Sequence, residues 1–124
     1  MEFSEVIQQR QSIKSYQPDK EISDAELKEL IQEVVLSPSS FNLQHWTFIA
    51  VKDTGIKEKI QQAAWGQEQV GTCPVLLVIC GKLNAHQDAS EIYKNVLKEV
   101  TEKVLPLIND FYEGKDQLQR DEAI

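Results

Sequence analysis

The chain has 124 residues, of which 41% are hydrophobic and 27% are charged, and its formal net charge is -7. This length and composition suit a single folded domain and exclude both a disordered chain and a pair of domains. A negative field repels phosphate backbones, so the charge argues against nucleic acid as a partner.

Hydrophobic periodicity divides the chain into helical and extended segments. Apolar residues recur at helical spacing in four stretches, and runs of β-branched and aromatic residues predict two strands. In chain order the sequence predicts a helix at 2–10, a turn at Gln17-Pro18-Asp19, a helix at 23–36, a strand at 47–51, a helix at 56–64, a strand at 74–80, a helix from 90 onward and the start of a further helix at 115–124.

Boundary signals sharpen this pattern. Ser23 and Glu26 have capping-box spacing, Pro106 is expected to kink or end the last long helix, and Gly114 predicts a C-terminal cap. The nearly continuous apolar run at 75–79 predicts a strand buried on both faces. Because a two-stranded sheet is marginal alone, we expect missing residues or another copy to complete it.

The cysteines and the N-terminal sequence indicate in which cellular compartment the protein is expected. Cys73 and Cys80 flank an apolar run and match neither a Cys-x-x-Cys metal spacing nor a disulfide framework, so we expect two packed thiols. The N-terminus carries no signal-peptide pattern, and no apolar run approaches the roughly 18 residues that cross a bilayer. The sequence therefore predicts a cytoplasmic protein without membrane contact.

The first group of candidate binding residues is Arg10-Gln11-Ser12-Ile13-Lys14. In an extended segment Ser12 and Lys14 project to the same side, and Arg10 enters from the end of the preceding helix. Two cations and a hydroxyl on one side favour a phosphate, because charge-assisted hydrogen bonds to phosphate are strong. The alternative is a solvated basic turn, since charged side chains are normally exposed.

The second group lies between a predicted helix and a predicted strand, in Ser37-Pro38-Ser39-Ser40-Phe41-Asn42-Leu43-Gln44-His45-Trp46. The amides of Asn42 and Gln44 each present a donor and an acceptor, which suits the edge of a heterocycle. The indole ring of Trp46 adds an apolar surface beside them. The alternative is a capping loop rich in serine and asparagine.

Taken together, Arg-x-Ser and the later Ser-Pro-Ser-Ser-x-Asn-x-Gln-x-Trp resemble the FMN-dependent nitroreductase family. The resemblance continues through the strand at 47–51, Gln67-Glu68-Gln69-Val70 and Cys73-Pro74, and covers most of residues 1–81 and more loosely the remainder. It implies an α+β fold, in which a mainly antiparallel sheet is wrapped by helices in an intertwined homodimer. Residues 1–124 would be a nitroreductase-like domain whose C-terminal part is missing.

The resemblance also implies an FMN site built from two copies of the chain. Arg10 and Ser12 would hold the phosphate, and Lys14 would lie near the flavin N1/O2 edge, where a cation stabilises the anionic reduced ring. The loop at 38–42 would come from the other subunit. The full set of implied cofactor-binding residues is Arg10, Gln11, Ser12, Lys14, Pro38, Ser39, Ser40, Asn42, Gln67 and Gln69.

Three positions depart from the family pattern. Gln11 stands where arginine or histidine is common. Gly66 stands where the family often has asparagine, one residue before Gln67, and Gln67 or Gln69 would contact the ring or ribityl chain. His45 replaces the usual proline before the tryptophan, and we expect it to loosen the loop slightly.

The implied activity is that of an FMN-dependent NAD(P)H oxidoreductase. NAD(P)H would give a hydride to FMN and leave, and the reduced FMN would pass electrons to a nitroaromatic or quinone acceptor by a ping-pong mechanism. The flavin carries the chemistry, so no dedicated catalytic side chain is expected. No metal site is expected either, because His45 and His86 lack ligand spacing. Two alternatives are a non-catalytic remnant of the fold and a module that dimerises through the exposed edge of the strand at 75–80.

Overall fold

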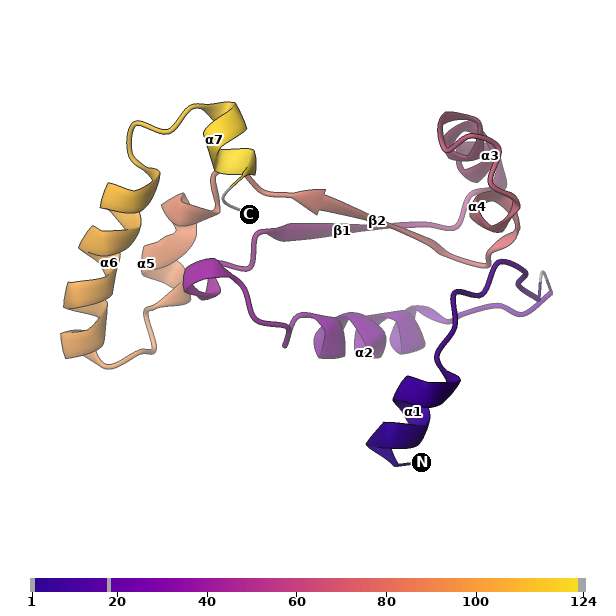
Figure 1. Ribbon diagram of the computed structural model, residues 1–124, viewed down its shortest axis with the longest axis horizontal. Helices are drawn as coiled ribbons and strands as arrows, with labels where there is room; N and C mark the ends of the chain where they lie inside the picture. Colours follow the sequence, from indigo (N-terminus) through magenta and orange to yellow (C-terminus); the bar gives the residue numbers. More distant parts are fainter. Residues whose placement is uncertain (1, 18, 123–124) are drawn as a thin grey trace. The chain divides into compact units, whose positions relative to one another are not determined.

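The computed structural model describes residues 2–17 and 19–122 (Figure 1). It divides into two compact units, the first formed by residues 1–23 with 50–77 and the second by residues 24–49 with 78–124. In chain order the elements are α1 (Phe3–Gln9), α2 (Asp24–Val34), the 3-10 turn η1 (Ser40–Asn42), β1 (Trp46–Val51), α3 (Thr54–Ala63), α4 (Glu68–Thr72), β2 (Leu76–Gly81), the 3-10 turn η2 (Ala85–Asp88), α5 (Ala89–Ile92), α6 (Lys98–Tyr112) and α7 (Gln117–Asp121).

The first unit is organised around α3 and α4, which pack against each other (Figure 1). The Asp53 side chain caps α3 by accepting a hydrogen bond from the Ile56 backbone N–H at 2.8 Å. Lys57 on α3 is buried, and its Nζ donates to the Cys73 carbonyl oxygen at 2.6 Å. This contact ties α3 to the segment that leads into β2.

The second unit has the main apolar core. Its helices α5 and α6 lie side by side (Figure 1), and η2 packs against both. The α6 residues that face this core recur at helical spacing, so one stripe of the helix is buried. The buried members of the core are Leu43, Ala85, Ala89, Ile108 and Tyr112.

The two strands form an antiparallel two-stranded sheet, and the division between the units falls inside both strands. The prediction that the second strand is buried on both faces is wrong. No residue of β2 is fully buried, and the Ile79 side chain is 65% exposed. Four of its six residues are half-buried and two are exposed, so its faces are not covered as those of a doubly buried strand are.

The predicted helix from residue 90 onward is the second correction. The structure has two helices, α5 and α6, separated by a break at residues 93–97. At the break, the Tyr93 hydroxyl donates to the Phe41 carbonyl oxygen at 2.7 Å, so a tertiary contact overrides the local periodicity. Pro106 does not end α6, which continues to Tyr112.

The other predicted helices and strands are confirmed with small shifts at their ends. Gly114 follows α6 with a positive φ of 75°, as expected for a C-terminal cap. A backbone bond from the Lys20 N–H to the Gln17 carbonyl supports the predicted turn, in which Pro18 lies outside the described residues. The predicted final helix corresponds to α7, and its residues 123–124 also lie outside them.

Both thiols are free, with Cys73 buried and Cys80 half-buried, as the sequence predicts. Within residues 2–17 and 19–122, none of the helices combines the length and the apolar character needed to cross a membrane.

Candidate functional site

The first predicted group lies where α1 ends. Arg10 has extended backbone angles (φ -61°, ψ 128°), so the helix stops at Gln9 and the chain runs on without regular structure. The side chains of Arg10, Ser12 and Lys14 are exposed. In the described ranges none of these three side chains makes a hydrogen bond or ion pair. They are therefore free to bind an external anion.

The second feature of the same unit is the start of α4. Trp65 and Gly66 have positive φ values of 56° and 71°, which form a tight turn directly before Gln67. The Gln69 Nε2 group donates to the Gln67 Oε1 atom at 2.8 Å, so the structure brings these two predicted residues together. Gln69 also borders a mainly apolar cavity of about 280 Å³, whose wall includes Tyr16 and Pro74.

The serine- and amide-rich loop, which we define as residues 38–45, belongs to the second unit and has a strained backbone. Phe41, Asn42 and Gln44 have φ values of 50°, 52° and 49°, in the left-handed region that non-glycine residues rarely adopt. Such outliers cluster at ligand-binding sites, where surrounding contacts hold them in place. The backbone therefore supports a binding role for this loop more strongly than a capping role.

Contacts with the second unit's core hold the loop. Within it, the Ser39 Oγ atom accepts a hydrogen bond from the Gln44 N–H at 2.9 Å. The Phe41 ring lies 5.6 Å from the Phe111 ring on α6, and Leu43 is only 2% exposed. Pro38, Ser40 and Asn42 remain exposed, whereas Ser39 is half-buried. The loop is thus fixed at its apolar residues and open at its polar ones.

His45 anchors this loop through a contact that the sequence did not predict. His45 is only 3% exposed, and its Nε2 atom lies 3.2 Å from the Tyr112 hydroxyl, within hydrogen-bonding distance. The two rings are 5.9 Å apart. The contact between two buried side chains restrains the end of the loop.

Tyr112 also connects the loop to His86. The His86 ring stacks on the Tyr112 ring at 5.0 Å with an interplanar angle of 9°. Burial lowers the pKa of His86 from its ordinary value of 6.5, and the positive charge of Arg120 and the neighbouring His45 lower it further. His86, Tyr112 and Arg120 line a cavity of about 330 Å³.

Sequence reasoning missed these supporting residues. The sequence patterns single out neither Tyr112 nor Tyr93, and Tyr93 falls inside the continuous helix predicted from residue 90 onward. The signal that could have found Tyr112 is its spacing of four residues from Ile108, which puts both on the same buried stripe. The pairing with His45, 67 residues away in the chain, leaves no local pattern.

The profile of the Nitroreductase family matches residues 7–99, well over half of the chain, and the match spans both predicted groups. The chain belongs to the nitroreductase family. The nitroreductase-like α+β fold is confirmed by similarity to solved structures, of which a Bacillus subtilis protein, ydfN, has a TM-score of 0.86 and 34% identity over 98% of this chain.

One further relative is named for NAD(P)H, and another was solved with FMN. The Bacillus subtilis protein "Putative NAD(P)H nitroreductase MhqN" is 35% identical over 136 residues, which cover 99% of this chain. A protein from Exiguobacterium sibiricum, solved in complex with FMN, has a TM-score of 0.87 and 27% identity over the whole of this chain. The nitroreductase chain described here spans about six tenths of the length of these relatives: 63% of MhqN, 62% of ydfN and 62% of the Exiguobacterium protein.

Proposed function

We propose that this protein is an FMN-dependent oxidoreductase that takes a hydride from NAD(P)H and reduces nitroaromatic or quinone-type acceptors by a ping-pong mechanism. Membership of the nitroreductase family supports the reaction class. The FMN bound to the Exiguobacterium relative supports the cofactor, and the name of MhqN supports the hydride donor. In this proposal the protein acts as a cytoplasmic homodimer.

The observation that carries the proposal is the exposed and unpaired state of Arg10, Ser12 and Lys14 within the described chain. Basic residues are outnumbered, because the chain has 13 lysines and arginines against 20 acidic residues. Two cations and a hydroxyl within five consecutive residues, with no partner among the described residues, fit a phosphate group. We assign Arg10 and Ser12 to the FMN phosphate, and Lys14 to the pyrimidine edge of the ring, with Gln11 in the same segment.

The loop at 38–45 would complete the site from the second copy of the chain. Its strained backbone is fixed before any ligand arrives, which reduces the entropy lost on binding. Pro38, Ser39, Ser40 and Asn42 would contact the flavin, whereas Gln67 or Gln69 would contact the ring or ribityl chain. When bound, FMN supplies the redox chemistry, so the residues of the chain need only bind and orient it.

Titration with FMN tests the cofactor assignment. We expect the purified protein to bind FMN, with a flavin absorbance band that NADPH or NADH bleaches. Arg10→Ala should weaken FMN binding by more than about tenfold, because a hydrogen bond to a charged group contributes about 1.5–3 kcal/mol. Lys59→Ala is the matched control, since Lys59 is an exposed cation on α3 and should leave the affinity unchanged.

Other outcomes separate the alternatives. A protein that stays colourless with added FMN would support a non-catalytic remnant of the fold. Soluble dimers without flavin would support the dimerising module. Equal FMN affinity in Arg10→Ala and the unmodified chain would refute the phosphate assignment even if flavin binds.

A further inference from the structure

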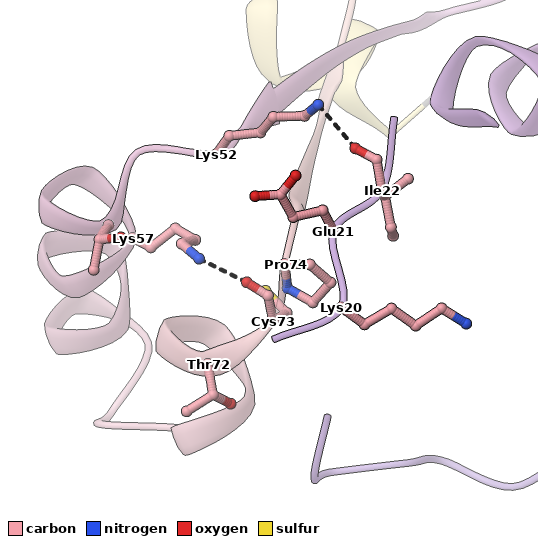
Figure 2. Close-up of a pocket in the computed structure, with 9 residues that line it drawn as sticks. Lys20, Glu21, Ile22, Lys52, Lys57, Thr72, Cys73 and Pro74 are labelled. Carbon is pink, nitrogen blue, oxygen red and sulfur yellow. Dashed lines mark hydrogen bonds between the residues drawn. The ribbon is translucent and has the colours of Figure 1, made fainter. Parts of the chain in front are cut away.

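We propose that the first unit has a second anion-binding site, in a cavity of about 380 Å³ lined by Lys20, Lys52 and Lys57, and that its ligand is a phosphate group. None of the residues assigned to FMN lines this cavity (Figure 2). The inference therefore stands independently of the proposed function.

The main argument is the buried charge of Lys57. This side chain is only 6% exposed, and one hydrogen bond, to the Cys73 carbonyl oxygen at 2.6 Å, is its only polar contact in the described part of the chain. An ammonium group has three N–H donors, so two stay without a protein acceptor. Buried charges are costly unless they are paired, and no described carboxylate lies within ion-pair distance of Lys57.

The rest of the wall adds positive charge. Lys52 donates from its Nζ to the Ile22 carbonyl oxygen at 3.0 Å, which fixes the segment that carries Lys20 (Figure 2). Glu21 is the only acidic residue on the wall, and its carboxylate enters the same cavity in Figure 2. Besides Lys52, the wall has Lys20 and Lys57 against one glutamate, so the cavity is positive inside a chain whose net charge is -7.

The position of the cavity favours an anion further. Thr54, the first residue of α3, lines it, and the first turn of a helix carries the positive end of the helix dipole. The volume is within the range of small-molecule sites, which begins at about 300 Å³. A phosphate group, which has several acceptor oxygens, suits the N–H donors that Lys57 has left over after its bond to Cys73.

Nuclear magnetic resonance with inorganic phosphate as the probe tests the site. Millimolar phosphate should shift the backbone amide signals of Thr54 and Thr72 and raise the melting temperature. Both effects should persist in Arg10→Ala, which removes the proposed FMN phosphate contact. A phosphate monoester, added in place of inorganic phosphate, distinguishes a free ion from a phosphorylated metabolite as the preferred ligand.

Three variants give the expected pattern. Lys57→Met should weaken phosphate binding by about tenfold, because it removes the buried ammonium and keeps most of the side-chain volume. Glu21→Gln should strengthen binding several-fold, because it removes the competing carboxylate, and it tests the site without disturbing a buried group. Lys59→Ala, outside the cavity, should bind phosphate as the unmodified chain does.

The proposal would be overturned by phosphate effects that Arg10→Ala abolishes, because the anion would then be bound at the FMN phosphate site. Absence of any shift at Thr54 and Thr72 in millimolar phosphate would also overturn it. If Lys57→Met does not fold, an unchanged phosphate affinity in Glu21→Gln would be sufficient to reject the site.

Discussion

Replacing Tyr112 with phenylalanine removes one hydroxyl group and leaves the packing of its ring intact. Tyr112 is 1% exposed, and its hydroxyl lies 3.2 Å from the His45 Nε2 atom. The other ring nitrogen of His45, Nδ1, is buried and has no partner among the described residues. After the substitution, neither nitrogen of a histidine that is 3% exposed would have a hydrogen-bond partner.

The cost follows from this loss. An unsatisfied buried polar group lowers the free energy of unfolding by about 1–3 kcal/mol. The contacts of the Tyr112 ring with His86 and Phe111 are kept, so no cavity term is added. We therefore expect Tyr112→Phe to destabilise the chain by about 1–3 kcal/mol in urea unfolding followed by circular dichroism.

A double-mutant cycle with His45→Leu separates the hydrogen bond from other effects. Removing both polar partners should cost less than the sum of the single substitutions, by a coupling of about 0.5–3 kcal/mol. Tyr16→Phe is the control, because the Tyr16 side chain is 43% exposed and should change stability very little. If Tyr112→Phe were no more destabilising than Tyr16→Phe, the hydrogen bond would not stabilise the loop.

Two further predictions concern pH and backbone strain. Because the pKa of His86 is lowered in the folded chain, the unfolded chain binds a proton below pH 6.5 that the folded chain does not, so stability should fall as the pH drops from 6.5 toward the folded pKa. His86→Gln should flatten that part of a melting-temperature profile against pH, and an unchanged slope would contradict the assignment. Gly114→Ala should cost about 1 kcal/mol in urea unfolding, because Gly114 has φ 75° and an added Cβ would contact nothing within 4 Å. Gly55→Ala, in α3 and without a positive φ, should be neutral or stabilising by comparison, so equal losses at both positions would show that conformation is not the cause.

The sequence predicted the elements whose signals are local. Apolar spacing was sufficient for α1, α2 and α3, and Gly114 was correctly expected to follow the last long helix. The break between α5 and α6 was not predictable in this way, because the Tyr93 hydroxyl bonds to a carbonyl 52 residues away. The exposure of β2 was also missed, since an apolar run alone does not show how many layers cover it.

In the candidate site, too, the sequence predicted residue types and local spacing but not long-range contacts. Residue types and spacing predicted that Arg10, Ser12 and Lys14 bind a phosphate. The structure adds that their side chains are exposed and unpaired within its described residues. The sequence also predicted that the loop at 38–45 binds a ligand, but it did not indicate the left-handed backbone of the loop. The contact of His45 with Tyr112 was not predicted, because the pattern showed a missing proline and not the distant Tyr112.

The core of the second unit stabilises the strained loop, which is part of the proposed flavin site. A left-handed conformation costs a non-glycine residue roughly 1–2 kcal/mol, and three such residues lie within positions 41–44. Burial of Leu43 and of the His45 ring, together with the Tyr93 hydrogen bond, offsets that cost. These stabilising contacts involve apolar side chains, ring atoms and a backbone carbonyl, whereas the side chains of Ser40 and Asn42 stay exposed. Loosening the core should therefore weaken ligand binding by the loop even when every polar residue on it is unchanged.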